Sequence, residues 1–346
     1  MGLSELNSLD SALDRFLQKE IAIPTNARQD ASRSHIYLRN VLRGKGDNDA
    51  TFPEILALED SDFLGGSFAR HTKIWPLDDI DVFLPLEGGG LVYRSGGQVL
   101  PYRLATDGEK SRLCLPMWLT NSYVDSAKVL QGFVSSLRDT YPSSKIGRDG
   151  HCANLQTTVA ATSESDGIGF DIVPCFMLKP DDGSEDIYLV PNGNGGWMHS
   201  NPRKDTEICS TLQEYHRGTY RHAVRLLKYW NKFEFADRFR SYYIELAVSK
   251  IFNEYMISGK PITHVSQAFT IAFSALVHAH AAGAAKPLVS GAPDVPAPVL
   301  STVELGILTA DANRADNSFN DAWKGNNLAS ALATLNTIFL SAKYFK

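Results

Sequence analysis

Apolar residues near the start of the chain recur every three or four positions, which is the spacing of one face of an α-helix. This pattern predicts a helix over residues 3–18 and, after Pro24, a second helix over residues 25–42. A further amphipathic pattern predicts a helix over Asp125–Thr140. Shorter apolar runs are typical of strands, and they cover residues 62–68, 79–86, 152–162 and 168–178. Strands mixed with helices in this order indicate an α/β or α+β lobe.

The pattern changes near residue 200, where turn-prone glycines are concentrated in Gly193–Asn201. From Thr206 the chain is mostly helix-compatible, and the helical patterns cover residues 220–233, 241–256, 264–279 and 328–345. An Ala/Pro-rich stretch, residues 281–300, is expected to be a surface loop. We therefore expect a first lobe over residues 1–197, which includes the N-terminal helices, and a helical second lobe over residues 198–346.

The segment from Pro261 to Ala285 carries no Asp, Glu, Lys or Arg and has to be considered as a membrane span. It contains His264, His278 and His280 with several Ser and Thr residues, which favour a buried helix instead. The N-terminal residues lack the apolar core of a secretory signal. These features predict a cytoplasmic protein without membrane contact.

The composition is that of a globular protein, and the formal net charge is −5. A dedicated binder of long nucleic acid normally carries a strong basic excess, so we expect no long nucleic acid as a partner. The four cysteines include no CxxC pair, which leaves no sequence case for a structural zinc site.

Asp79 and Asp81 stand two positions apart in an apolar run, so both carboxylates project from one face if the run is a strand. Adjacent carboxylates repel each other, and a hard divalent cation neutralises them well. On its own, the pair also fits a solvated strand end at which the carboxylates face water.

Asp171 is a lone charge in the apolar run of residues 168–178. A buried carboxylate is unfavourable unless it is paired, bound to a metal or held by backbone amides at a strand end. If this strand neighbours the one with Asp79 and Asp81, three carboxylates converge. Such a set can bind two Mg²⁺ ions that bridge the attacking oxygen, the phosphorus and the leaving group.

Gly65, Gly66 and Ser67 form a turn-prone sequence after an apolar strand start. Backbone N–H groups at such a turn can bind phosphate oxygens, because glycine lets a ligand approach the chain closely. The Ser67 hydroxyl adds a polar group. Most turns of this kind only reverse the chain, so the motif gains its weight from the aspartates that follow it.

Basic residues in the second lobe recur at helical spacing, namely Arg221, Arg225, Lys228 and Lys232. Such a stripe is usually a solvated face, but it would hold a triphosphate if it faced the first lobe. Ser241 could offer a hydroxyl to phosphate, and Tyr242 a ring on which a base stacks. Of Tyr242 and Tyr243, one is expected to belong to the core.

Taken together, these motifs resemble a known superfamily. GGS, DID and FDIVP are similar to the Gly-Ser, Asp-x-Asp and later Asp of nucleotidyltransferases. The blocks YLVPNGNGGWMHSNPRKDT, VRLLKYWN, SYYIEL and AW…LNTIF resemble those of the CD-NTases, the cGAS/DncV-like nucleotidyltransferases of bacterial anti-phage (CBASS) systems. The resemblance runs from about residue 50 to the end of the chain and implies an α+β, two-lobed polymerase-beta-like fold, with a mixed-sheet catalytic lobe and a helical C-terminal lobe.

The resemblance also implies roles for individual residues. Asp79, Asp81 and Asp171 would be catalytic and would bind Mg²⁺, for which Mn²⁺ can substitute. The residues implied to bind the nucleotide are Gly66, Ser67, Asn201, Arg225, Lys228, Ser241 and Tyr242. Lys228 would contact phosphates, and Asn201 would lie near the pocket of the donor base.

The implied activity joins nucleoside triphosphates, with ATP and GTP favoured, into a cyclic oligonucleotide and releases pyrophosphate. The product would be a purine-containing cyclic dinucleotide such as cGAMP, which diffuses to a downstream effector in anti-phage defence. Three alternatives stay open. They are an enzyme that makes linear oligoadenylate or tails RNA, a nucleotide-binding pseudoenzyme, and a metal-dependent phosphohydrolase, although the chain lacks the His clusters typical of the last class.

Overall fold

The computed structural model describes most of the chain, and the structural statements below concern residues 8–57, 61–95, 102–105, 111–157, 167–178, 187–289, 292–324, 327–342 and 344. Three predicted elements run partly outside the described residues. They are the helices over residues 3–18 and 328–345 and the strand over residues 152–162.

The chain folds into two compact units, each built from separate stretches of sequence. The sheet unit comprises Pro24–Ala69 and Pro76–Arg203, and the helical unit comprises Met1–Ile23, Arg70–Trp75 and Lys204–Lys346. These units differ from the expected lobes in two respects. The first 23 residues group with the helical unit, and the chain passes from the sheet unit to the helical unit for the last time between Arg203 and Lys204.

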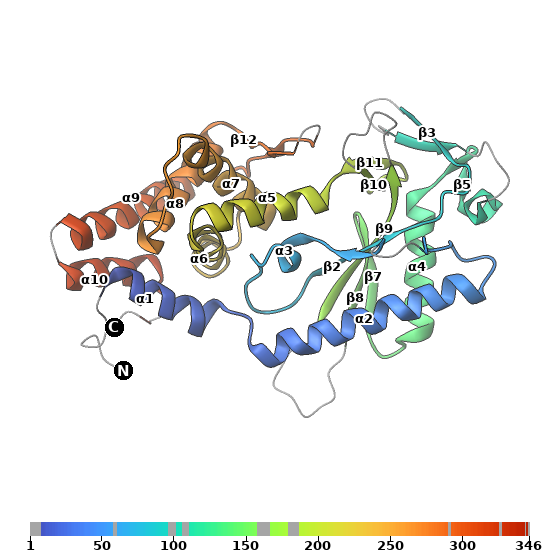
Figure 1. Ribbon diagram of the computed structural model, residues 1–346, viewed down its shortest axis with the longest axis horizontal. Helices are drawn as coiled ribbons and strands as arrows, with labels where there is room; N and C mark the ends of the chain where they lie inside the picture. Colours follow the sequence, from blue (N-terminus) through green and yellow to red (C-terminus); the bar gives the residue numbers. More distant parts are fainter. Residues whose placement is uncertain are drawn as a thin grey trace. The chain divides into compact units, whose positions relative to one another are not determined.

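The sheet unit contains a mixed sheet and several helices (Figure 1). Its helices are α2 (Thr25–Asn48), α3 (Gly66–Ala69) and α4 (Ser126–Thr140), with 3₁₀ turns η3 (Arg112–Cys114) and η4 (Pro116–Trp118). Its strands are β1 (Phe63–Leu64), β2 (Ile80–Pro85), β3 (Val92–Ser95), β4 (Tyr102–Ala105), β5 (Leu119–Thr120), β6 (Tyr123–Val124), β7 (Lys145–Asp149), β8 (Cys152–Gln156), β9 (Gly169–Leu178), β10 (Ile187–Pro191) and β11 (Trp197–Ser200).

Strand β9 is the centre of this sheet. It pairs in parallel with β2 and antiparallel with both β8 and β10, so it has neighbours on either side. The order through the described strands is β1-β2-β9-β10-β11-β4-β6-β5, with β8 branching from β9 and β7 from β8. A strand with neighbours on both edges and largely buried residues needs an almost continuous apolar sequence, as this one has.

Helix α4 shows how sequence spacing sets the packing of a helix on this sheet. Its buried apolar residues recur at helical spacing and are Val129, Leu130, Phe133, Val134 and Leu137. Asp125 caps the helix, because its carboxylate accepts a hydrogen bond from the Ala127 N–H at 2.9 Å. The helix packs against β7 and β8.

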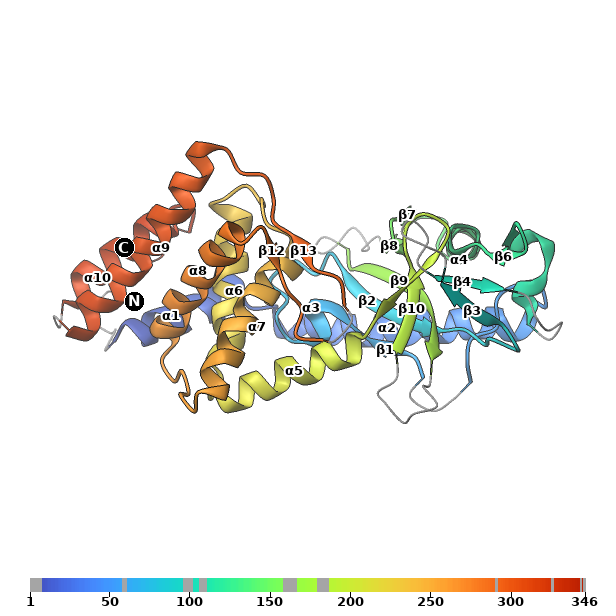
Figure 2. The ribbon, with the colours of Figure 1, turned by 90° about the horizontal axis from the view of Figure 1, so that it is seen from above.

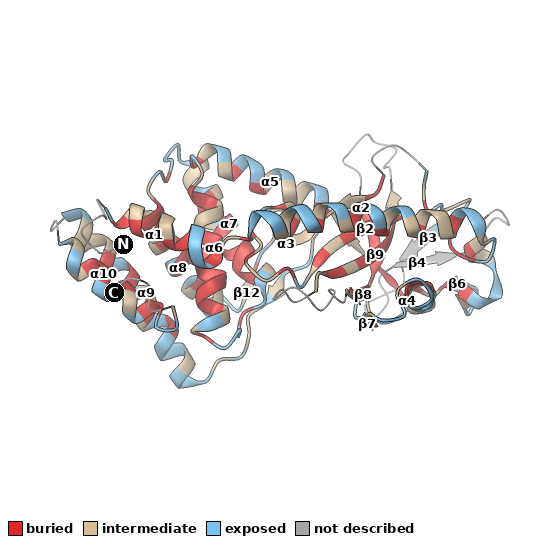
Figure 3. Cartoon of the chain, turned by 90° about the horizontal axis from the view of Figure 1, so that it is seen from below, coloured by how far each residue is buried: buried red, intermediate tan, exposed pale blue. Residues whose placement is uncertain are grey.

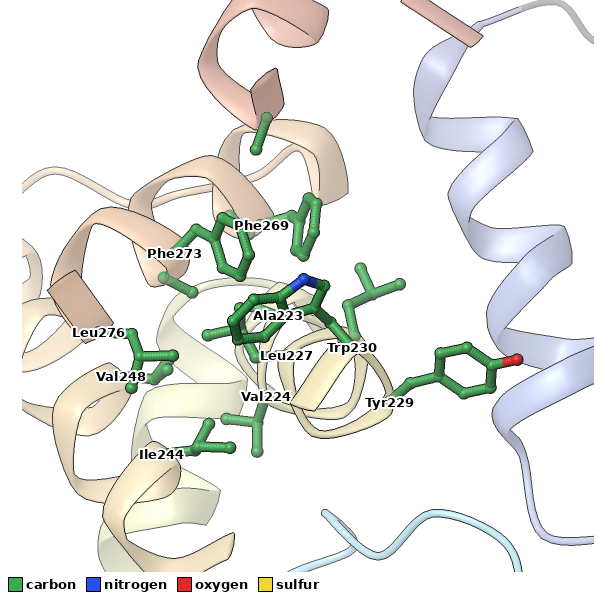
Figure 4. Close-up of a cluster of buried hydrophobic side chains, with 14 of the residues drawn as sticks. Ala223, Val224, Leu227, Tyr229, Trp230, Ile244, Val248, Phe269, Phe273 and Leu276 are labelled. Carbon is green, nitrogen blue, oxygen red and sulfur yellow. The ribbon is translucent and has the colours of Figure 1, made fainter. Parts of the chain in front are cut away.

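The helical unit is built around three helices, α6 (Thr219–Phe233), α7 (Ser241–Ile257) and α8 (Val265–Ala281). Figure 4 shows Trp230 of α6 among Phe269 and Phe273 of α8, while Ile244 of α7 lies beside Val224 of α6. The remaining elements are α1 (Leu9–Phe16), the π-helical turn η2 (Leu17–Ile21), α5 (Pro202–Tyr215), β12 (Ala284–Ala285), β13 (Val295–Pro296), α9 (Thr302–Lys324) and α10 (Leu328–Ile338). Figure 2 shows α8, α9 and α10 from a second direction, and Figure 3 shows that buried positions are concentrated in α6, α7, β2 and β9.

A short segment of the helical unit, Arg70–Trp75, interrupts the sheet unit in sequence. It follows α3 directly and precedes β2, so it joins two elements of the other unit. The Trp75 N–H donates to the Ile21 carbonyl at 3.2 Å, which ties the end of this segment to η2. We call Arg70–Trp75 the strap.

The structure corrects several element boundaries. The predicted strand over residues 62–68 is only the two-residue β1, because Gly66 has φ +58° and begins α3. Part of the glycine-rich Gly193–Asn201 is strand β11. Within the stretch expected to be a loop, residues 284–285 and 295–296 pair as β12 and β13. In the described part of the chain, no helix is long and apolar enough to span a membrane.

Candidate nucleotidyltransferase site

The glycine turn packs directly on strand β2. The Gly65 N–H donates to the Asp81 carbonyl at 3.0 Å. A Cβ atom built on Gly66 would lie 1.6 Å from Oδ2 of Asp81, and one on Gly65 would lie 2.2 Å from the Phe83 ring. Only glycine therefore lets the backbone of the turn lie this close to the Asp81 carboxylate. Ser67 follows in α3 and is buried.

Asp81 and Asp171 are register partners across the parallel pair β2–β9. Register partners on adjacent strands project to the same face of a sheet. Asp79 lies one residue before β2 begins, and its charge raises the pKa of Asp171. The structure thus confirms that the strand with Asp171 neighbours the strand with Asp81, and it places all three carboxylates in one region of the sheet unit.

Asp171 has a hydrogen-bond partner on strand β8 that the sequence did not reveal. Asn154 lies opposite it in the antiparallel register, and the Asn154 side-chain amide donates to Asp171 Oδ1 at 2.7 Å. The pKa of Asp171 is raised by burial and by the charge of Asp79, while the hydrogen bond from Asn154 acts in the opposite direction. Burial and the charge of Asp171 also raise the pKa of Cys152, so the thiol stays protonated, and it donates to the Asp149 carbonyl at 3.3 Å.

The chemistry of these residues fits a hard divalent cation. Carboxylate oxygens are the ligands that Mg²⁺ prefers, and negative charge is concentrated around Asp171. As the side chains are arranged, no group of three His, Cys, Asp or Glu residues within the described part of the chain is close enough to share a metal ion. Asp81 and Asp171 are register partners, and the three side chains would have to move closer together to share a metal ion.

Asn201 belongs to the same unit, at the junction between β11 and α5. It is half-buried, and it follows Ser200, whose register partner on β10 is Tyr188. Its assignment to the donor-base pocket stays a prediction.

The predicted residues of the helical unit are divided between two helices. Lys228 on α6 is 4% exposed, and its ammonium lies 2.5 Å from Oε1 of Glu245 on α7. The neighbouring Arg225 directs its guanidinium at the strap, where Nε and one terminal nitrogen donate to the His71 carbonyl at 3.0 and 2.6 Å. Lys228 is therefore buried and ion-paired, although it belongs to the basic stripe expected from the sequence. Its contact with phosphate stays a prediction.

Ser241 and Tyr242 begin helix α7. Ser241 is exposed, and the Tyr242 hydroxyl donates to Asp205 Oδ2 at 3.1 Å. The guanidinium of Arg70 lies over the Tyr242 ring, 5.6 Å from its centre. Tyr243 is almost completely buried, which confirms that one of the two tyrosines belongs to the core. Stacking of a base on Tyr242 stays a prediction.

Sequence reasoning missed Asn154, Arg70 and Glu245. Glu245 could have been found, because it is a lone carboxylate in the apolar run YIELAV and so meets the criterion that singled out Asp171. Arg70 and Asn154 carried no such signal. Each becomes notable only through the partner that the fold supplies.

The chain resembles known proteins in sequence and in fold. No family model matches the chain. A probable cyclic nucleotide synthase of Bacillus cereus (strain VD146) is 28% identical over 229 residues, which cover 65% of this chain and 66% of that protein. The chain thus aligns with slightly under two thirds of that relative.

Two solved structures match nearly the whole chain. E. coli MS115-1 CdnC with ATP superposes with a TM-score of 0.62 at 17% identity, over 97% of this chain and 98% of CdnC. CdnC in its complex with HORMA-deltaN gives a TM-score of 0.61 at the same identity and coverage. CdnC is a CD-NTase. The chain therefore has the α+β fold of the CD-NTases, the family that its sequence resembles.

Proposed function

We propose that this protein is a Mg²⁺-dependent nucleotidyltransferase that joins nucleoside triphosphates into a cyclic oligonucleotide and releases pyrophosphate. One observation carries the proposal. Asp81 and Asp171 are adjacent on parallel strands, and the Gly66 backbone lies against the Asp81 carboxylate. A phosphate held at the glycine turn would thus lie beside the carboxylates that bind the metal.

In this proposal each residue of the sheet unit has a defined task. The N–H groups around Gly66 and the Ser67 hydroxyl hold the triphosphate. Asp79, Asp81 and Asp171 would hold two divalent cations, which when bound neutralise the phosphates and the developing charge. Asp171 accepts the proton of the acceptor ribose hydroxyl on a carboxylate oxygen, and Asn154 keeps that carboxylate in place.

The residues on the helical unit are proposed to bind the rest of the nucleotide. Lys228 and Arg225 add positive charge near the triphosphate, Ser241 offers its hydroxyl, and Tyr242 lies under the base. Asn201 is proposed to contact the donor base. A cyclic product forms when the linear intermediate binds again with its ends exchanged, so one set of carboxylates serves both bonds.

The relatives support the choice of substrate and product class. One is named a probable cyclic nucleotide synthase, and the solved structure of CdnC contains ATP. We therefore propose ATP and GTP as substrates and a purine-containing cyclic dinucleotide such as cGAMP as the product. We further propose that the enzyme works in the cytoplasm and that its product activates an effector in anti-phage defence.

The test is incubation of the purified protein with labelled ATP, GTP, CTP and UTP and with Mg²⁺ or Mn²⁺. Phosphatase treatment and chromatography then separate cyclic products, which have no terminal phosphate, from linear ones. We expect a phosphatase-resistant product that requires both a metal and Asp81. Omission of each triphosphate in turn identifies the bases.

A matched pair of variants controls this experiment. D81N removes a proposed ligand, whereas D78N removes the same charge from an exposed residue three positions earlier. We expect loss of product in D81N only. Products that phosphatase degrades would indicate linear oligonucleotides, and binding of triphosphates without turnover under any condition would indicate a pseudoenzyme.

A further inference from the structure

A buried carboxylate on α7 bridges two cations that come from different parts of the helical unit. Oε2 of Glu245 lies 2.6 Å from Nε of Arg70, and Oε1 lies 2.5 Å from Nζ of Lys228. The exposed fractions of these residues are 2% for Glu245, 6% for Arg70 and 4% for Lys228. Each carboxylate oxygen thus pairs with a different cation, and all three side chains are almost completely buried.

The two cations lie on different segments of the helical unit, so the contact joins these segments. Arg70 is the first residue of the strap and follows Ser67 by three positions. Lys228 lies on α6, three residues after Arg225, which holds the His71 carbonyl of the same strap. Glu245 itself lies one helical turn after Ser241 and Tyr242 on α7. One carboxylate therefore connects α6, α7 and the strap.

The strap needs such tethers. His71 has φ 57°, a left-handed conformation that a non-glycine residue adopts only when its surroundings hold it there. Arg70, the residue before His71, is held by Glu245. The His71 carbonyl is held by Arg225, and the end of the strap is held by the hydrogen bond from Trp75 to Ile21. The sequence then runs directly from Trp75 to Asp79. The strap is thus the stretch that separates the glycine turn from the first proposed metal ligand.

We propose that Glu245 is a positioning residue of the nucleotidyltransferase site. Its bridging carboxylate fixes the strap against α6 and α7, and the strap is the stretch of chain that joins α3 to β2. It also fixes the ammonium of Lys228. This inference rests on the proposed function, because positioning is defined by the reaction that it serves, but the tethering of the strap can be tested without activity.

The principal test is E245Q. Glutamine keeps the shape of the side chain but offers only one oxygen, so it cannot accept from both cations. We expect kcat to fall by about 100-fold, as displacements of about 1 Å at a reacting group do, while KM for ATP changes much less. We also expect trypsin to cleave folded E245Q after Arg70 or Lys73, because both residues lie in the strap that Glu245 no longer holds.

Asp311 provides a matched control. It is 5% exposed in the same unit, and its carboxylate accepts from Trp230 Nε1 at 2.9 Å and pairs with Arg314. D311N thus removes a buried, paired charge by the same chemical change. We expect it to lower the temperature of unfolding while kcat and the tryptic pattern stay as in the wild type. Equal losses of kcat in D311N and E245Q would reduce Glu245 to a structural role and overturn the proposal.

A second variant, R70K, tests the proposal even if E245Q does not fold. R70K keeps the positive charge but replaces the guanidinium fork, so Glu245 retains a cation to pair with. We expect a smaller loss of kcat than in E245Q and measurable tryptic cleavage after Lys73. Wild-type kcat together with a protected strap in R70K would overturn the proposal.

The two proposals fail in different ways. If the wild-type protein makes no product, the proposed function fails, and tryptic cleavage of E245Q against D311N still decides whether Glu245 holds the strap. If the wild type makes product and E245Q makes it at the same rate with a protected strap, the function stands and the positioning role is wrong.

Discussion

The Cα atom of Gly66 lies so close to the carboxylate of Asp81 that a methyl group on Gly66 would overlap Oδ2, at 1.6 Å. This contact links the turn proposed to hold phosphate with a carboxylate proposed to hold metal. Gly66 also has φ +58°, a left-handed backbone conformation that favours glycine. Substitution at this single position should therefore disturb both groups at once.

For G66A we expect loss of product by about 100-fold or more, since the Asp81 carboxylate must move to make room. The left-handed conformation adds a destabilisation of about 1–2 kcal/mol. The measurement is initial rate of product formation together with the free energy of unfolding in urea. Gly44 of α2, where a Cβ atom would meet nothing within 4 Å, is the control. G44A should keep full activity, and wild-type activity in G66A would contradict the close packing.

For N154A we expect kcat to fall by about 10- to 100-fold, as is usual when a residue that orients a metal ligand is removed. The physical reason is that Asp171 loses the donor that holds Oδ1. Steady-state kinetics in Mg²⁺ provide the measurement. Gln156, two positions along the same strand, donates instead to the Gly167 carbonyl. A loss in Q156A as large as that in N154A would show that the effect comes from β8 as a whole.

Stability in acid should depend on Glu245. Burial alone would raise its pKa, but the charges of Arg70 and Lys228 outweigh burial and lower it to about 2, from a usual value of 4.5. The unfolded state therefore binds more protons in this window, and stability falls as the pH drops from 4.5 towards 2. The contribution is about 3 kcal/mol. Urea unfolding at several pH values should show that the wild type loses more stability across this window than E245Q; equal losses would contradict the prediction.

His216 should remain neutral in the folded protein. Its Nδ1 accepts from the Ile262 N–H at 3.0 Å, so the proton resides on Nε2, which donates to the Phe252 carbonyl. Burial lowers its pKa below the usual 6.5, although the bond to Phe252 opposes this. The unfolded state then binds the extra proton first, and stability is lost as the pH falls below 6.5.

NMR tests this prediction directly. Long-range ¹H–¹⁵N correlations should show the Nε2–H tautomer of His216 at pH 7, and its ring should begin to titrate only below pH 6.5. The wild type should lose more stability than H216Q between pH 6.5 and 5. A ring protonated at pH 7 would contradict the assigned hydrogen bonds.

The sequence predicts the centre of the sheet well, because the apolar runs around Asp81 and Asp171 form the largely buried strands β2 and β9. It predicts α9 poorly. The buried positions of that helix are Leu308, Asp311, Ala315 and Ser318, and two of these four are polar. Their spacing is helical, but the apolar pattern that would reveal it is too weak.

The site residues that the sequence analysis missed are those whose partners come from distant parts of the chain. Asn154 is an ordinary polar residue until the β8–β9 register places it opposite Asp171. Glu245 and Arg70 lie far apart in sequence, so their ion pair depends on tertiary structure alone. The proposed metal and phosphate ligands could thus be selected by residue type and local pattern, and Glu245 carries the same signal, whereas Asn154 and Arg70 become notable only through the fold.

The parallel pairing of β2 with β9 also governs when the site can exist during synthesis. A parallel pair needs a long crossover, and here residues 86–168 lie between the two strands in sequence. Such long-range pairing forms late in folding, because the loop must close before the contacts are gained. A nascent chain that ends before residue 169 has the glycine turn and Asp81 but lacks Asp171. The proposed site can therefore assemble only after β9 has left the ribosome and inserted beside β2.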